Sequence, residues 1–95
     1  MSETVEQSFT IRNELGLHAR PAGEFVALAG TFECEISVSR GGEWVDGRSV
    51  LSLLSLAASN GTQLMVRAIG SDALDAVTAL GVVLEREAAR APDAT

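Results

Sequence analysis

The feature that most constrains the fold is an alternating stretch over residues 33–40. Cys34, Ile36 and Val38 are apolar, and each is flanked by polar side chains, namely Glu33, Glu35, Ser37 and Ser39. Successive side chains of a β-strand point to opposite faces, so this stretch predicts a strand with one buried and one solvated face. Strands of this kind are typical of antiparallel sheets that are covered on one side. The pattern therefore favours a two-layer domain with helices on one face of the sheet.

Three more segments are predicted as strands. Gly41-Gly42 is a two-residue hairpin signal, and residues 43–46 form the predicted return strand. The same alternation predicts strands over 7–12 and 62–69. Their inward side chains are expected to be Phe9, Ile11, Leu64, Val66 and Ala68.

Three segments are predicted as helices. The first lies between Pro21 and Gly30, with an apolar face made of Ala22, Phe25, Val26 and Ala29. The second is short and runs from Ser49, its predicted cap, to about Ala58. The third follows Gly70, with Ser71 as its cap, Asp72 in its first turn and an inward stripe of Leu74, Val77, Leu80, Leu84 and Ala88. Gly81 inside this helix predicts close packing against the sheet, because glycine is otherwise unfavourable there.

The predicted order is β-α-β-β-α-β-α, which is an α+β arrangement of the split β-α-β type with an added C-terminal helix. With 95 residues the chain has room for one domain, expected over residues 1–90, with a flexible tail over 91–95. Many unrelated functions share this plan, so the fold alone does not identify the function.

The charge and cysteine content exclude several classes of function. Seven basic and thirteen acidic residues give a net charge of −6, which argues against binding nucleic acid or an anionic membrane through the whole surface. The longest apolar-rich stretch, Val50 to Ala58, is too short to span a bilayer, so no membrane insertion is expected. Cys34 is the single cysteine and cannot form an internal disulfide, which favours a reducing compartment. Residues 1–7 are acidic and polar, unlike a signal peptide. We therefore expect a cytoplasmic protein, and no pattern indicates more than a monomer.

The chain has one histidine, His18, in the segment Gly16-Leu17-His18-Ala19-Arg20-Pro21-Ala22. It precedes the first predicted helix, where unpaired backbone N–H groups and the positive end of the helix dipole attract anions. Arg20 adds a cation whose shape suits phosphate oxygens, and Gly16 lets the backbone bend. An imidazole can hold a phosphoryl group covalently for a second transfer. The pattern is consistent with a phosphoryl carrier.

Other interpretations of His18 remain open from the residues alone. A lone histidine before a helix is more often a surface or capping residue. A metal site is disfavoured, because His18 and Cys34 cannot supply a four-ligand shell by themselves. Catalysis by a serine, a histidine and an acid lacks any nucleophile-elbow pattern.

The segment from Gly16 to Ala22, followed by Phe25-Val26, resembles the active-site segment of the histidine-containing phosphocarrier protein family, HPr. Two further matches support the resemblance. One is Gly47-Arg48-Ser49-Val50-Leu51 with Leu53 and Ser55-Leu56, which is similar to the segment around the family's regulatory serine. The other comprises Asn60-Gly61-Thr62 and Gly70-Ser71-Asp72-Ala73. Together the matches span about residues 5–88.

The resemblance implies both a fold and a function. HPr proteins are open-faced β-sandwiches with a four-stranded antiparallel sheet in the order 1-4-2-3 and helices on one face. They are not enzymes and need no cofactor. They accept a phosphoryl group from enzyme I of the phosphoenolpyruvate-dependent phosphotransferase system (PTS) and pass it to enzyme IIA proteins. Carried over, His18 would be phosphorylated on Nδ1, with backbone N–H groups from Ala19 and Arg20 and the Arg20 side chain supporting transfer.

Ser49 has two interpretations. On residue type it is a helix cap, because serine favours that position. The resemblance implies a regulatory phosphorylation site for HPr kinase/phosphorylase. A phosphate there would add charge near the surface that docks enzyme I and hinder transfer.

The second predicted helix is unusually apolar, since six of the eight residues 50–57 are apolar. It is either embedded in the core or partly exposed as a docking patch. The resemblance favours a patch of Val50, Leu51 and Leu54, bordered by Gly23 and Glu24 of the first helix.

The chain also departs from the family. Ala27, Gly30 and Ser52 occupy positions where family members often carry lysine, so electrostatic steering toward enzyme I should be weaker. An alternative is therefore a regulatory, nitrogen-type phosphotransferase module that acts by phosphorylation-dependent binding instead of sugar uptake. A third hypothesis is a small-ligand sensor or structural domain of the same architecture.

Overall fold

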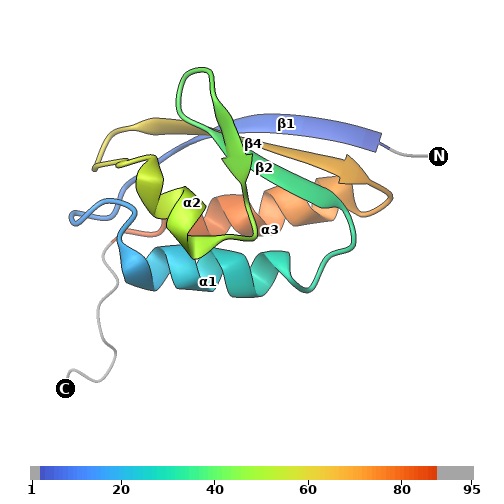
Figure 1. Cartoon of the computed structure of the whole chain (residues 1–95), viewed down its shortest axis with the longest axis horizontal. Coiled ribbons are helices and arrows are strands. Elements are labelled where there is room, and N and C mark those ends of the chain that lie inside the picture. The colour runs from blue at the N-terminus through green and yellow to red at the C-terminus, as the bar shows by residue number, and fades with distance from the viewer. Residues whose placement is uncertain (1–2, 88–95) are drawn as a thin grey trace.

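The computed structural model describes residues 3–87 and contains four strands and three helices in the predicted order. The elements are β1 (Glu3–Thr10), α1 (Ala19–Ala29), β2 (Glu35–Ser39), β3 (Trp44–Asp46), α2 (Val50–Ser55), β4 (Gln63–Gly70) and α3 (Ala73–Glu85). The strands form one antiparallel sheet in the order β1-β4-β2-β3. The helices cover one face of this sheet (Figure 1). The predicted α+β fold and strand order are confirmed.

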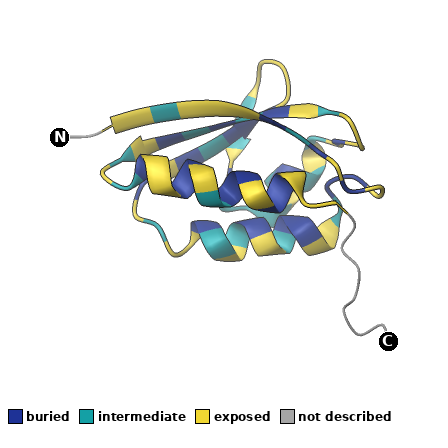
Figure 2. Cartoon of the chain, turned by 180° about the vertical axis from the view of Figure 1, so that it is seen from behind, coloured by how far each residue is buried: buried dark blue, intermediate teal, exposed yellow. Residues whose placement is uncertain are grey.

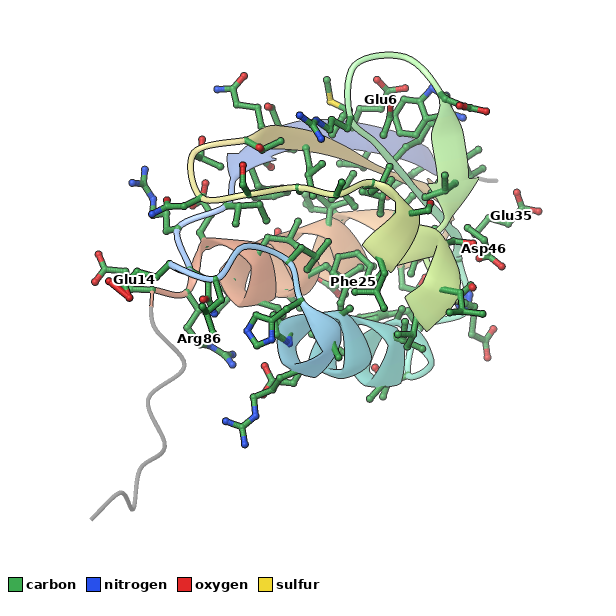
Figure 3. All side chains as sticks on the ribbon, turned by 60° about the vertical axis from the view of Figure 1, so that its left-hand side comes forward. Glu6, Glu14, Phe25, Glu35, Asp46 and Arg86 are labelled. Atoms are coloured by element: carbon green, nitrogen blue, oxygen red, sulfur yellow. The ribbon has the colours of Figure 1, made fainter. Side chains whose placement is uncertain are left out.

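The core lies between the sheet and the helices. The inward side chains predicted for the strands are buried, namely Phe9, Ile11, Cys34, Ile36, Val38, Leu64, Val66 and Ala68. From the helix layer, Phe25 of α1 is fully buried and points toward the sheet (Figure 3). Burying one such side chain contributes about 1.5–3 kcal/mol before the entropy of ordering the chain is subtracted. The outer faces of α1 and α3 remain exposed (Figure 2).

The strand limits differ from those predicted. β1 starts at Glu3 and pairs with β4 along its whole length, so it begins four residues before the predicted position 7. Polar side chains at the start of β1 hide this part of the strand from a pattern based on buried residues. The β2–β3 connection spans residues 40–43, because Ser39 pairs with Trp44. The expected two-residue hairpin is therefore wrong; both glycines do take positive φ values, 85° and 154°.

The helix limits also differ. α1 begins at Ala19, ahead of Pro21, which makes His18 the N-cap. α2 is shorter than predicted and ends at Ser55. The N-cap of α3 is Asp72 instead of Ser71.

The inward face of α3 is rotated relative to the predicted stripe. Val77, Leu80 and Leu84 are buried as predicted, but Leu74 is 58% exposed, so its placement in the stripe is wrong. Small residues take its place, since Ala73 and Ala76 are fully buried. Ala88 lies outside the described residues. A Cβ on Gly81 would collide with the ring of Phe9 on β1, which confirms the predicted close packing.

The loop that leads into α1 lies at one end of the molecule. The loop over residues 11–18, the N-terminus of α1 and the C-terminus of α3 share one end of the molecule (Figure 1). The C-terminus of α1 and the N-terminus of α3 share the opposite end. Between residues 3 and 87, no helix has the length and apolar character needed to cross a membrane. The predicted tail, residues 91–95, lies outside the described part of the chain.

Candidate functional site

The loop that leads into α1 is a series of tight turns ending at His18. The Leu15 N–H donates to Asn13 Oδ1, and the Gly16 N–H donates to the Asn13 carbonyl oxygen, with N···O distances of 2.9 Å in both cases. The His18 N–H then donates to the Gly16 carbonyl oxygen at 3.0 Å. Gly16 has a φ of 75°, a conformation that favours glycine. These turns set the direction from which the chain enters the helix.

The loop rests on the segment that follows α2. The Leu17 N–H donates to the Ala58 carbonyl oxygen at 2.9 Å, and both residues are buried. A Cβ on Gly16 would lie only 2.5 Å from the same carbonyl oxygen. Glycine is therefore needed at this position for two reasons, its φ value and the contact with Ala58. The residue next to His18 is fixed by a buried backbone contact.

The N-terminus of α1 is open to an anion. His18 is the N-cap but makes no side-chain capping bond, and the helix begins with the Ala22 N–H donating to the His18 carbonyl oxygen at 3.0 Å. Within residues 3–87 the N–H groups of Ala19 and Arg20 have no acceptor, and Pro21 has no N–H. Two unpaired donors thus point out of the positive end of the helix, which is the arrangement that binds phosphate.

The two nitrogens of the His18 ring differ in environment. The side chain is half-buried, and Nε2 has no exposed surface and no hydrogen-bond partner in the described part of the chain. A reagent from solution has no access to Nε2 in this conformation. Of the two ring nitrogens, Nε2 is thus the one that the protein encloses.

Arg20 is exposed and makes no ion pair or hydrogen bond with residues 3–87 through its guanidinium. Most other arginines are already engaged. Carbonyl oxygens bind the guanidinium groups of Arg40 and Arg48, and carboxylates bind those of Arg67 and Arg86. The arginine beside the open helix end is thus free to bind an anion.

Comparison with known proteins shows the family to which the chain belongs. A family model described as the PTS HPr component phosphorylation site matches residues 5–86. The chain belongs to the HPr family. It is therefore a phosphoryl carrier of the PTS and not an enzyme, as the sequence resemblance implied.

Individual HPr proteins support the assignment. The phosphocarrier protein HPr of Pseudomonas putida is 45% identical over 78 residues, which covers 78% of this chain and 87% of that protein. The HPr-like protein Crh of Bacillus subtilis is 35% identical over 83 residues, covering 87% and 98% of the two chains. The crystal structure of HPr from Bacillus anthracis superposes with a TM-score of 0.82 at 32% identity and covers 86% of this chain and 98% of that chain.

Ser49 of this HPr is the N-cap of α2, the position predicted for it. Its Oγ accepts a hydrogen bond from the Ser52 N–H at 3.1 Å, and its own N–H donates to the Asp46 carbonyl oxygen at 3.3 Å. The side chain is half-buried. The predicted cap is confirmed, and a regulatory role at this position stays a prediction.

The predicted docking residues divide into exposed and half-buried groups. Leu51 is 79% exposed, whereas Val50 and Leu54 are partly buried against the core, so the expectation of an exposed part of α2 is confirmed. On α1, Gly23 has open space above it and Glu24 is exposed. The helices α1 and α2 pack against each other, so these residues belong to neighbouring elements.

Sequence reasoning missed one exposed apolar residue near the histidine. Leu15 lies in the turn before Gly16 and is 75% exposed. The signal was available, because Asn13 and Gly16 bracket a tight turn and a side chain at the tip of such a turn faces solvent. Glu14 of this loop lies at the same end of the molecule as Arg86, which follows α3 and binds Glu24 with an N···O distance of 2.8 Å (Figure 3).

The strongest electrostatic perturbations lie at the opposite end. Burial, reinforced by Asp72, raises the pKa of the Cys34 thiol to about 11. The pKa of the Asp72 carboxyl is lowered chiefly by the Glu33 N–H, which donates to it at 2.9 Å. Asp72 lies at the N-terminus of α3, which is at the opposite end of the molecule from the N-terminus of α1, where His18 is the N-cap (Figure 1). Nowhere in residues 3–87 do three or more side chains of the metal-binding types gather into a site.

Proposed function

We propose that His18 carries the phosphoryl group and that Nδ1 is the reacting atom. The observation that supports this most directly is the open N-terminus of α1, where two N–H groups without an acceptor in residues 3–87 accompany a histidine whose Nε2 is buried. A neutral ring with its proton on Nε2 has a lone pair on Nδ1. That lone pair forms the new N–P bond as the donor's bond to phosphorus breaks.

Ala19 and Arg20 stabilise the phosphoryl group. Their N–H groups donate to its oxygens, and the Arg20 guanidinium adds a fixed positive charge. A carrier must also release the group, and an exposed site with few donors suits transfer in both directions. The donor is phosphorylated enzyme I and the acceptors are enzyme IIA proteins, in line with the family.

The partners dock on a surface formed by α1, whose N-cap is His18, and by α2, which packs against it. It comprises Leu51, with Val50 and Leu54 at its edge, and the bordering residues Gly23 and Glu24. An exposed leucine on the surface of a carrier protein is a common anchor for transient complexes. The same surface has to serve both donor and acceptor, since one histidine reacts with each.

Phosphorylation of Ser49 by an HPr kinase/phosphorylase is the proposed means of regulation. Ser49 already caps α2, and a phosphate at a helix N-terminus is locally favourable. Its added charge would lie at the start of the helix that carries Leu51. We expect it to weaken docking of enzyme I more than it weakens the fold.

The central test is a phosphorylation assay. The protein is incubated with phosphoenolpyruvate and enzyme I, and intact mass is measured before and after mild acid. We expect one phosphoryl group per chain that is lost in acid and absent in His18→Ala. No gain of mass with several enzyme I proteins, or an unchanged gain in His18→Ala, would overturn the proposal.

Arg20 allows a matched test of the anion site. Arg20→Ala should slow phosphoryl acceptance about tenfold, because a charged donor at the transition state is removed. Arg12→Ala is the control, since Arg12 is also exposed, precedes the same loop and makes no bond with residues 3–87. Equal rates for the two variants would show that net charge, and not the Arg20 contact, sets the rate.

A regulatory module of the nitrogen type is the second candidate function. The observation that favours it is the charge of the docking surface. All seven basic residues of the chain are arginine, and none lies among the docking residues, whose charged member is Glu24. Transfer rates from the phosphorylated protein to sugar-type and nitrogen-type enzyme IIA proteins separate the candidates. Faster transfer to the sugar type would reject the regulatory assignment.

A further inference from the structure

The segment after α2 contains the one non-glycine residue with a positive φ in residues 3–87. Ala57 has a φ of 51° and directly follows Leu56, the C-cap of α2. Glycine normally occupies this position, because a Cβ in the left-handed conformation costs about 1–2 kcal/mol. The conformation persists only where surrounding contacts enforce it.

One of those contacts comes from outside the segment. Arg40, in the β2–β3 connection, donates from Nη1 to the carbonyl oxygens of Leu56 at 2.9 Å and Ala57 at 3.0 Å. The last turn of α2 contains no basic residue of its own. Arg40 therefore supplies a cation to the negative end of α2 and binds the carbonyl of the left-handed residue itself.

The next residue of the segment holds the His18 loop. Ala58 is buried and its carbonyl oxygen accepts the Leu17 N–H, while Gly16 lies against the same atom. A continuous path of backbone contacts thus runs from Arg40 through Ala57 and Ala58 to the residue before His18. A change in the conformation of Ala57 alters the direction of the Ala58 carbonyl.

We propose that Arg40 is a positioning residue for phosphoryl transfer. By holding Ala57 in the left-handed conformation, it keeps the Ala58 carbonyl under Leu17 and the His18 ring in the orientation that presents Nδ1. This inference rests on the proposed function of His18. Arg40 touches neither the phosphoryl group nor the reacting atoms; it acts through the backbone of residues 56–58.

The test compares three arginine variants. Arg40→Ala removes both hydrogen bonds, and Arg40→Lys keeps a cation that can make one of them. Arg67→Ala is the matched control, because it removes the same charge from the sheet, where Arg67 binds Glu6 and lies over the Trp44 ring at 4.0 Å. Each variant is assayed with enzyme I and phosphoenolpyruvate at a temperature where thermal unfolding shows that it is fully folded.

We expect kcat for phosphorylation of Arg40→Ala to fall about threefold to tenfold with a smaller change in KM, because misplacing a reacting group acts on the chemical step. Arg40→Lys should recover part of the loss, and Arg67→Ala should match the wild type. A purely structural role predicts a lower melting temperature with unchanged kinetics for the folded protein, and that result would overturn the proposal.

Hydrogen exchange of the Leu17 amide supplies a readout that does not depend on phosphorylation. In Arg40→Ala the Leu17 amide should exchange faster than the change in the global free energy of unfolding explains. In Arg67→Ala any change in its exchange rate should be accounted for by the change in that free energy. Equal protection in both variants would reject the path through Ala58. If the wild type itself is not phosphorylated, the proposed function fails, while the exchange result still decides whether Arg40 controls the loop.

Discussion

At the start of α2, Ser49 Oγ accepts a hydrogen bond from the Ser52 N–H at 3.1 Å, whereas at the start of α1 the N-cap His18 makes no side-chain capping bond. Both residues occupy the same position relative to their helices. The Ser49 side chain accepts a hydrogen bond from a free N–H of its helix, whereas the His18 side chain leaves the Ala19 and Arg20 N–H groups without an acceptor in residues 3–87. The proposed phosphoryl group would therefore meet two free donors at the start of α1 and would not have to displace a capping side chain.

The third helix gives an intermediate case. Its N-cap Asp72 does not cap α3 either, but its carboxylate accepts the N–H groups of Glu33 at 2.9 Å and Cys34 at 3.1 Å. The side chain is used to join the end of α3 to the segment before β2. Of the three helix starts, α1 is the one whose N-cap side chain makes no hydrogen bond in the described part of the chain.

An uncapped helix start carries a cost in stability. Replacing a good N-cap by a residue that cannot cap costs about 0.5–2 kcal/mol. The packing of Ala22 and Phe25 in the core compensates for this at α1, since both are fully buried. The difference between α1 and α2 therefore suggests that α1 gives up local stability for an anion site, and substitutions can test it.

The largest effect is expected at the N-cap of α1. His18→Ser and His18→Ala should both lose the acid-labile phosphoryl group completely, because neither provides the nucleophilic nitrogen. Serine can cap the helix and alanine cannot, so His18→Ser should be about 1 kcal/mol more stable than His18→Ala. Intact mass after incubation with enzyme I and urea unfolding measure the two effects. Equal stabilities of His18→Ser and His18→Ala would mean that a side-chain cap at the start of α1 adds no stability.

The next effect is expected at the turn that presents His18. Gly16→Ala should destabilise the fold by about 2–3 kcal/mol, because it combines a φ of 75° with a Cβ placed 2.5 Å from the Ala58 carbonyl oxygen. Gly23→Ala is the control, since a Cβ there has nothing within 4 Å. As a substitution within a helix it should stabilise the protein by about 0.5–1 kcal/mol.

Chemical denaturation of the two glycine variants separates these outcomes. If Gly16→Ala unfolds at the wild-type midpoint, then the loop tolerates another path and the α1 end is not fixed by the contact with Ala58. The phosphorylation rate of the folded Gly16→Ala protein is expected to fall as well, since His18 follows this turn by two residues.

Sequence patterns predicted the sheet well, because each central strand alternates between a buried and a solvated face. Cys34, Ile36 and Val38 showed this directly, and they are buried. The polar start of β1 and the outward rotation of Leu74 were not predictable in the same way. Both depend on tertiary neighbours: β1 extends because β4 offers a full-length partner, and small alanines allow α3 to approach the sheet with Leu74 outside.

In the candidate site, too, the features set by local sequence were predicted and those set by tertiary contacts were not. His18 and Ser49 were predicted at helix starts from residue type and spacing, and both are N-caps. Three features of the site were not predicted: the burial of Nε2, the hydrogen bond from Leu17 to Ala58, and the hydrogen bonds from Arg40 to the end of α2. Local sequence does not encode them, because the two contacts join residues that lie far apart in the chain and the burial of Nε2 depends on tertiary packing.

A smaller effect is expected at the N-cap of α2. Ser49→Ala should cost about 1 kcal/mol, because it removes the acceptor of the Ser52 N–H. Ser52→Ala is the control: it makes the same chemical change three residues later and leaves that backbone N–H in place. Thermal unfolding compares the two. A loss in Ser52→Ala as large as in Ser49→Ala would show that the capping bond is not the source of the effect.

The smallest effect is expected at Asp72 and depends on pH. The Glu33 N–H lowers the pKa of the Asp72 carboxyl in the folded protein, so the ionised carboxylate stabilises the fold above the pKa of the unfolded chain, and this stabilisation is lost as the pH falls through the lowered pKa. Asp72→Asn should therefore be less stable than the wild type at neutral pH, and the difference should shrink in acid, as the pH falls from the ordinary pKa of an aspartate through the lowered one.

Urea unfolding from pH 7 to pH 2.5 measures this difference as two curves that converge in acid. Asp75→Asn is the matched control, because it removes a charge from the first turn of the same helix without the bonds to Glu33 and Cys34. Curves for Asp72→Asn and the wild type that stay parallel into acid would mean that the carboxylate gains nothing from those two N–H groups. The side-chain bonds of Asp72 would then add no stability that distinguishes the start of α3 from the start of α1.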